Sequence, residues 1–147
     1  MSKLYNVEHT DIIPKPSSSL PDSALIAALL KTHLLPHLTP LDLSKPLPQL
    51  STGQNQLFAL TRALLQVQII NQHSQGSKPI LLLDEATSSL DVETEAVMRE
   101  VIREEFTEKG HTVIAITHRV VEGMDVIVWL GSGRVERVER VGSVVEI

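Results

Sequence analysis

The spacing of apolar residues predicts two helices in the first half of the chain. A helix start at Asp22 is followed by alanines, leucines and isoleucine, and this helix is expected to end near Pro36. Prolines then recur through residues 36–48, which are expected to form a loop. Apolar side chains recur with helical spacing over residues 54–72, where no proline or glycine intervenes. This pattern predicts a long, largely buried helix.

The second half of the chain combines short apolar runs with one amphipathic helix. Strands are expected at residues 80–83, 112–117, 125–130 and 134–141. The first three read as buried strands, the first of them on both faces, and the last as a more exposed one. Asp91 is placed to cap a helix from residue 92 to about 106. Strand, helix, strand in this order indicates a βαβ unit with parallel pairing and a right-handed crossover, so the expected fold class is α/β.

Composition narrows the class of protein. The chain has 147 residues, 42% of them apolar, and a formal net charge of −5, which suits one globular domain. The acidic balance argues against nucleic acid as a partner. The absence of cysteine excludes disulfides and thiolate metal sites, and no apolar run approaches the ~20 residues of a membrane helix. Segment 1–21 is rich in proline and serine and is expected to be an extended or disordered leader.

Polar side chains follow two of the predicted strands. Asp84 and Glu85 end the first strand, and His118 follows the second. Ligands of open parallel sheets bind at the carboxyl ends of strands, so these side chains are expected to converge on one crevice. Two carboxylates and an imidazole suit a magnesium–phosphate site, in which they hold the metal, orient water and contact phosphate. The alternative is a turn with two acids and a histidine that ends a strand; each residue taken singly favours that alternative.

A second candidate site lies at the start of the long helix, at Leu50-Ser51-Thr52-Gly53-Gln54. Free N–H groups and the helix dipole make such a terminus suitable for an anion. Ser51 can add a hydroxyl, and Gly53 permits close approach of a phosphate. The alternative is a plain serine N-cap in which Gly53 relaxes the turn. Taken alone, this segment favours that alternative.

Together these segments resemble the ABC (ATP-binding cassette) ATPases. Residues 50–54 are similar to the signature motif, 80–85 to the Walker B strand with its catalytic glutamate, 88–91 to the D-loop, and 116–119 to the switch histidine loop. The four motifs follow the family's order, and the resemblance covers about residues 22–134. Residues 56–65 and 84–91 are similar to the multidrug-resistance-associated (C) subfamily of exporters. The resemblance implies a partial P-loop NTPase fold, with parallel core strands, a crossover helix and part of a helical subdomain.

The resemblance implies roles at the strand ends. Asp84 would hold Mg²⁺, largely through water. Glu85 would be the general base for the hydrolytic water. His118 would contact the γ-phosphate of ATP and link it to Glu85.

It also implies roles at the helix starts. Ser51, Gly53 and Gln54 would bind the γ-phosphate of ATP held by a second cassette, and Asp91 would lie at the seam between the two. Thr52 belongs to the same ATP-contacting segment but departs from the glycine that is common at its position. A β-branched residue fits there if its φ stays negative.

The P-loop pattern Gly-x-x-x-x-Gly-Lys-Ser/Thr does not occur in the 147 residues. That loop supplies most of the donors that grip the phosphates. The chain is therefore expected to be the second half of a nucleotide-binding domain, with a helical signature part at 22–77 and an α/β part at 78–147. It could be a truncated gene product, a gene-model fragment or one piece of a split transporter. Unpaired strand edges and apolar faces predict marginal stability and poor solubility of the isolated chain. Without a P-loop the isolated chain is also expected to be inactive.

The function implied by the resemblance is the ATP-binding and ATP-hydrolysing part of a membrane exporter. ATP and Mg²⁺ would be its cofactors, and a second nucleotide-binding domain and membrane-spanning domains its partners, at the cytoplasmic face of a membrane. One alternative is a catalytically dead remnant, or a module that completes a partner's ATP site. Another is a chromosome-maintenance ATPase. Such proteins carry heptad coiled coils before the signature, where this chain has prolines.

Overall fold

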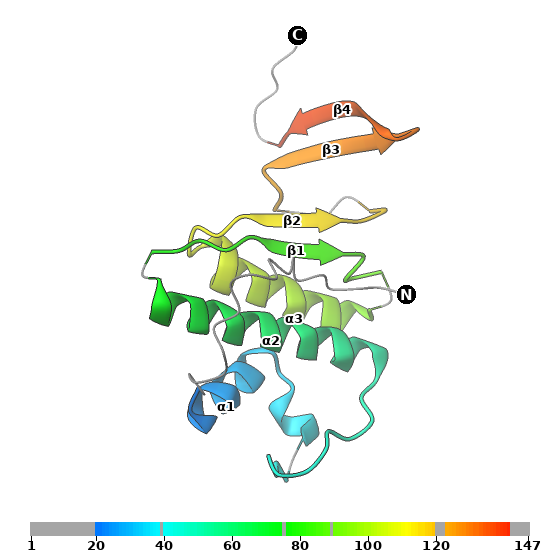
Figure 1. Cartoon of the computed structure of the whole chain (residues 1–147). Helices are drawn as coiled ribbons and strands as arrows, with labels where there is room; N and C mark the ends of the chain where they lie inside the picture. Colours follow the sequence, from blue (N-terminus) through cyan, green and yellow to red (C-terminus); the bar gives the residue numbers. More distant parts are fainter. Residues whose placement is uncertain (1–19, 39, 75, 89, 120–122, 142–147) are drawn as a thin grey trace.

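The computed structural model describes residues 20–38, 40–74, 76–88, 90–119 and 123–141. Nearly all of the expected leader at 1–21 therefore lies outside the described residues. In chain order the elements are α1 (Asp22–Lys31), a 3₁₀ turn η1 (Leu35–Leu38), α2 (Thr52–His73), β1 (Leu81–Asp84), α3 (Val92–Ile102), a π-helical turn η2 (Arg103–Thr107), β2 (Val113–Ile116), β3 (Val126–Gly131) and β4 (Arg134–Arg140) (Figure 1). Helices and strands are thus mixed, as the α/β expectation requires.

Helix α1 begins as predicted but ends one turn early. The backbone N–H of Thr32 donates to the carbonyl of Ala28, and His33 then turns into the left-handed region with a φ of 56°. The buried hydroxyl of Thr32 also lies 2.8 Å from the hydroxyl of Thr61 in α2. The left-handed backbone of His33 ends the helix before Pro36, and the contact between the two hydroxyls packs its end against α2.

Helix α2 occupies the predicted range, but its last turn is exposed. The buried positions are Leu57, Leu60, Thr61 and Leu64. Their spacing is that of one helix face. The expectation of a largely buried helix is therefore wrong for the last turn. None of the helices in the described ranges is long and apolar enough to cross a membrane.

The helix predicted up to about residue 106 divides into two geometries. Regular α3 ends at Ile102, and the wider turn η2 carries the chain on to Thr107. The buried stripe of Met98, Val101 and Phe106 still faces the core. Phe106 is only 2% exposed and meets the ring of His111 edge-on, with 5.8 Å between centroids. The π-helical turn therefore keeps the last aromatic residue of the stripe in the core.

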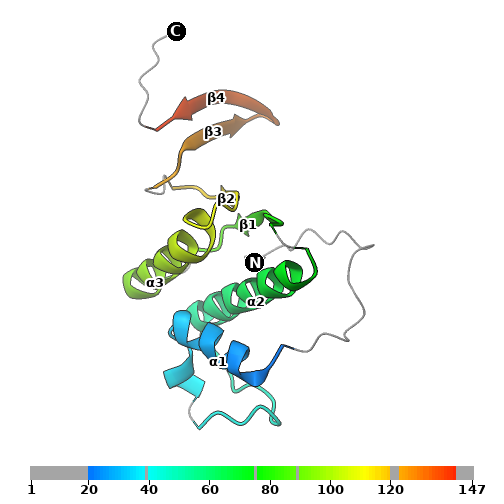
Figure 2. The ribbon, with the colours of Figure 1, turned by 90° about the vertical axis from the view of Figure 1, so that its left-hand side faces the viewer.

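Strands β1 and β2 pair in parallel, which confirms the predicted βαβ unit. Both α2 and α3 lie on the same side of this two-stranded sheet (Figure 2). Leu81 and Leu83 point to the helices and are buried. On the opposite face Ile114 is 47% and Ile116 is 52% exposed. The predictions that the strand at 80–83 is buried on both faces and that the strand at 112–117 is buried are wrong for this face, because no element in the described ranges covers it.

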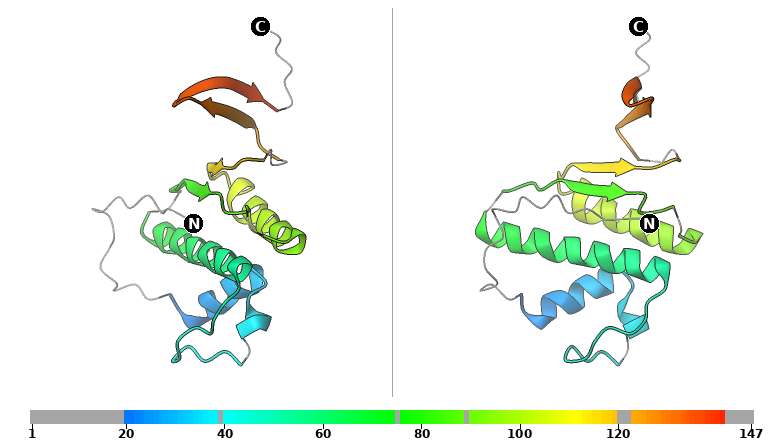
Figure 3. Two further views of the ribbon diagram at one scale, coloured as in Figure 1. Left: turned by 90° about the vertical axis from the view of Figure 1, so that its right-hand side faces the viewer. Right: turned by 45° about the vertical axis from the view of Figure 1, so that its right-hand side comes forward.

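Strands β3 and β4 form a separate antiparallel hairpin that lies beyond β2, away from α1 and α2 (Figure 3). Ser132 and Gly133 connect them with φ angles of 51° and 74°, the geometry of a tight two-residue hairpin loop. The exposed β4 was predicted correctly. β3 was expected to be buried, but its apolar side chains are exposed: Val126, Val128, Trp129 and Leu130. Within the described chain the hairpin has no layer to pack against.

The exposed hairpin generates a prediction about self-association. Leu130 is 73% exposed and lies in a contiguous apolar strand, a feature that favours aggregation. We expect Leu130→Glu to reduce self-association in size-exclusion chromatography with light scattering and to leave the helical circular dichroism spectrum unchanged. The matched control Leu83→Glu places a charge at a 6% exposed position and should abolish that spectrum. Unchanged self-association of Leu130→Glu would contradict the prediction.

Candidate functional site

The ends of β1 and β2 bring Glu85 and His118 together. The strands pair in register up to Asp84 and Ile116, and the N–H of Glu85 adds a 2.9 Å hydrogen bond to the carbonyl of Ile116. Just beyond these ends, Nε2 of His118 lies 2.7 Å from Oε1 of Glu85. An ionised carboxylate only accepts, so the imidazole donates to it. Topology thus brings a base and an imidazole into direct contact; their chemical roles stay predictions.

The backbone of Glu85 adopts a left-handed conformation, with a φ of 48°. For a residue with a Cβ this conformation costs about 1–3 kcal/mol and persists only when its surroundings fix it. The carbonyl of Glu85 accepts two hydrogen bonds from Ser88, one from the N–H at 3.1 Å and one from the hydroxyl at 2.9 Å. Both backbone polar groups of Glu85 are therefore bonded. Ser88 belongs to the segment 88–91 that resembles the D-loop, and the sequence alone does not predict these bonds.

Asp84 is the last residue of β1 and is half-buried. Since side chains alternate along a strand, Asp84 lies on the sheet face opposite the helices, with Leu82. The described ranges contain no cluster of three or more histidine or acidic side chains that could hold a metal by themselves. Mg²⁺ usually takes one or two carboxylates together with substrate phosphates and water. A single strand-end aspartate therefore fits Mg²⁺ that arrives with a phosphate ligand.

The start of α2 is a complete capping box. The N–H of Gln54 donates to the hydroxyl of Ser51 at 3.2 Å, and the N–H of Ser51 donates to the side-chain oxygen of Gln54 at 2.9 Å. This is the serine N-cap that the sequence left open as an alternative. Thr52 opens the helix without a positive φ, so its β-branched side chain is accommodated, as expected.

Gly53 allows the starts of α2 and α3 to pack closely. A Cβ at this position would lie 3.2 Å from Cγ2 of Thr94 and 3.6 Å from Cδ2 of Leu90. Gly53 lies within α2 and has no positive φ. The interpretation that it relaxes a turn is therefore wrong. Without a Cβ, Gly53 packs close to the start of α3, where an added Cβ would require Thr94 to shift by a few tenths of an ångström.

Asp91 caps α3 with both carboxylate oxygens. The N–H of Thr94 donates to Oδ1 at 2.8 Å and its hydroxyl donates to Oδ2 at 2.9 Å. These hydrogen bonds, the one from the backbone N–H foremost, lower the pKa of the Asp91 carboxyl. The N-termini of α2 and α3 lie at the same end of the molecule as the carboxyl ends of β1 and β2 (Figure 1). The candidate residues therefore occupy one end of the fold.

Arg119 follows β2 and contacts both the turn after β1 and helix α3. Its Nη2 donates to the carbonyl of Thr87 at 3.1 Å and to Oε2 of Glu95 at 3.3 Å. In the sequence Arg119 belongs to the segment 116–119 that resembles the switch histidine loop, and its position next to His118 is the one signal that points to it.

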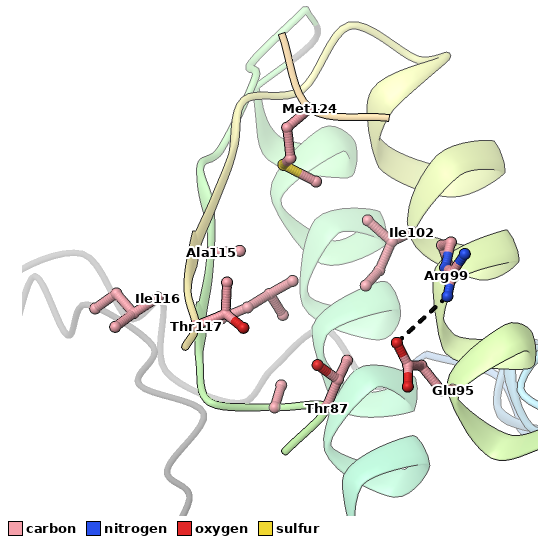
Figure 4. Close-up of a pocket in the computed structure, with 10 residues that line it drawn as sticks. Thr87, Glu95, Arg99, Ile102, Ala115, Ile116, Thr117 and Met124 are labelled. Atoms are coloured by element: carbon pink, nitrogen blue, oxygen red, sulfur yellow. Dashed lines mark hydrogen bonds and ion pairs between the residues drawn. The ribbon is translucent and has the colours of Figure 1, made fainter. Parts of the chain in front are cut away.

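A small apolar pocket lies between α3 and β2 (Figure 4). Ala115, Thr117 and Met124 line one side, and Glu95 and Ile102 line the other. Its volume is about 50 Å³, whereas pockets for small ligands measure about 300–1,000 Å³. This pocket is therefore too small for a nucleotide.

The chain is similar in sequence to several known proteins. No family model matches the chain. ABC transporter FGM5 from Gibberella zeae is 40% identical over 90 residues, which are 59% of this chain and 6% of that protein. ABC multidrug transporter B from Aspergillus fumigatus is 41% identical over 88 residues, 58% of this chain and 5% of that protein. These relatives are ABC transporters.

A third relative matches more of the chain. Metal resistance protein YCF1 from Saccharomyces cerevisiae is 34% identical over 137 residues, which are 87% of this chain and 8% of that protein. The chain thus spans less than a tenth of the length of each of these relatives. The similarity to ABC transporters that the motifs indicated is confirmed at this level, and the C subfamily stays a prediction.

The Asp91 cap generates a pH prediction. Because the folded-state pKa of Asp91 is lowered, its ionised form stabilises the fold above its unfolded pKa of about 3.9, and this stabilisation is lost as the pH falls toward the folded value. In urea unfolding from pH 7 to pH 2.5, the wild-type midpoint should fall more steeply than that of Asp91→Asn. Asparagine can still cap the helix but does not titrate. Parallel pH curves would contradict the prediction.

Proposed function

We propose that residues 22–147 are part of the nucleotide-binding domain of an ABC-type exporter similar to the C subfamily. In this proposal 22–77 belong to the helical signature part and 78–147 to the α/β part of a P-loop NTPase fold, at the cytoplasmic face of a membrane. The observation that carries the proposal is the 2.7 Å contact between Glu85 and His118 at the ends of parallel strands. The similarity to transporters, one of them named for multidrug transport, supports it.

At the strand ends, Glu85 would act as the general base. Its carboxylate would take a proton from the water that attacks the γ-phosphorus, while the bond to ADP breaks. His118 would orient the Glu85 carboxylate through its hydrogen bond and contact the γ-phosphate. Asp84 would hold Mg²⁺, which supplies charge neutralisation on the phosphates when bound. The strained backbone of Glu85 supports this reading, since such strain clusters at functional sites.

At the helix starts, residues 51–54 would contact the ATP of a second nucleotide-binding domain. The N-terminus of the 22-residue helix α2 offers N–H groups and the positive end of its dipole to an anion. Asp91 would lie at the seam between the two domains. Membrane-spanning domains would be the further partners.

A second candidate function is a module that completes a partner's ATP site without hydrolysing ATP itself. The observation that favours it is the exposed start of α2, where Ser51 and Thr52 can meet a nucleotide held by another chain. In that case the Ser51 segment would contact the partner's nucleotide, and Glu85 and His118 would not hydrolyse ATP.

The first test addresses nucleotide binding by the chain alone. The P-loop provides most of the phosphate donors, so we expect isothermal titration calorimetry with Mg²⁺ and ATP to show no binding tighter than about 1 mM. A sample without nucleotide, checked by circular dichroism, controls for folding. Saturable binding would show that the chain carries a phosphate cradle that its sequence does not reveal.

The second test addresses the base. When the chain is fused behind a P-loop half from an ABC protein, Glu85→Gln should retain ATP and slow its hydrolysis on the order of 100-fold or more. His118→Ala should also lower turnover, because a γ-phosphate contact is lost. Glu93→Gln, an exposed carboxylate in the first turn of α3, is the matched control and should hydrolyse ATP normally. Undiminished turnover of Glu85→Gln would remove Glu85 from the base role.

A further inference from the structure

Arg119 makes three hydrogen bonds in addition to the strand pairing and the Glu85–His118 contact. Its guanidinium reaches the carbonyl of Thr87 in the turn after β1, at 3.1 Å, and the carboxylate of Glu95 in α3, at 3.3 Å. Its own N–H donates to the hydroxyl of Thr117 at 3.1 Å. One residue thus joins the turn after β1, the turn after β2 and the helix between the two strands.

The turn after β1 holds Glu85 in a strained backbone conformation. Glu85 has a φ of 48°, and the turn from Glu85 to Ser88 is closed by the two hydrogen bonds from Ser88. Those bonds shape the turn internally but do not fix it relative to His118. Arg119 bonds to this turn at Thr87 and directly follows His118 in the chain. It therefore fixes one member of the pair relative to the other.

We propose that Arg119 is a positioning residue: its guanidinium holds the two turns at the spacing in which Glu85 and His118 hydrogen bond. Glu95 fixes the guanidinium in turn. Its side chain is only 20% exposed, and it also pairs with Arg99 at 3.3 Å through the other oxygen. Each oxygen of the Glu95 carboxylate thus accepts from one arginine, and the oxygen that binds Arg119 orients its guanidinium toward Thr87. The consequence for ATP hydrolysis rests on the proposed function, but the geometric claim does not.

The test reads the His118 ring directly. The full chain is labelled with ¹⁵N in its histidine rings, and the His118 signals are assigned with His118→Gln. Glu85→Ala provides the reference spectrum for a lost hydrogen bond. We expect Arg119→Ala to move the His118 ring signals at least half of the way to that reference. Arg119→Lys, which keeps the charge but has one donor group, should move them less.

Arg99→Ala is the matched control, since Arg99 lies in α3 and binds the other oxygen of the same carboxylate. It should leave the His118 signals at their wild-type positions. Wild-type signals in Arg119→Ala would overturn the proposal. Equal shifts in Arg99→Ala and Arg119→Ala would also overturn it, because the effect would then come from α3 rather than from the contact with Thr87.

Folding is checked on every variant by circular dichroism. If Arg119→Ala loses the helical spectrum, the His118 ring signals are measured in Arg119→Gln instead. A shift at least half of the way to the Glu85→Ala reference is again expected, and wild-type signals would again overturn the proposal. Loss of the spectrum in both variants would overturn the proposal, since Arg119 would then be needed for the fold and not for the pair. No nucleotide is present in these experiments. Their failure therefore leaves the general-base test with Glu85→Gln unaffected, and the reverse also holds.

Discussion

The parallel, in-register pairing of β1 with β2 is the constraint on which the candidate site depends. It sets Asp84 opposite Ile116, and the next N–H, that of Glu85, completes the ladder. A slip of one residue would turn every side chain of a strand to the other face. Leu81 and Leu83 would then leave the core. Burial of these leucines against α2 and α3 therefore selects the register that brings Glu85 to His118.

A second constraint is local strain that longer-range contacts offset. A left-handed glutamate is unfavourable by itself, so the conformation of Glu85 implies that its neighbours over-determine it. The strand contact to Ile116 and the turn closed by Ser88 act on the backbone of Glu85. Arg119 acts on the same turn two residues beyond Glu85, through its hydrogen bond to the carbonyl of Thr87. The site is thus held by a sheet bond, a turn and a charged side chain, each from a different part of the chain.

The features that sequence predicted well are those set by nearby residues. The caps at Ser51 and Asp91, the range of α2 and the βαβ order follow from spacing within one or two turns. The burial of a strand depends on which other elements cover each face of its sheet. The apolar composition of the strand does not reveal whether such an element is present. Sequence therefore failed for β3 and for the second face of β2. The contact of Arg119 with Glu95 joins residues that are 24 positions apart in the sequence. The sequence alone does not show which of its many acidic residues an exposed arginine pairs with.

The exposed apolar faces connect the stability of this chain to its proposed function. Ile114 and Ile116 on β2 and the side chains of β3 leave water only when another layer covers them. A layer that binds the folded chain and not the unfolded chain stabilises the fold by mass action. In the proposed function that layer comes from the rest of a nucleotide-binding domain. The same association that completes the phosphate site would then also stabilise the sheet whose ends hold Glu85 and His118.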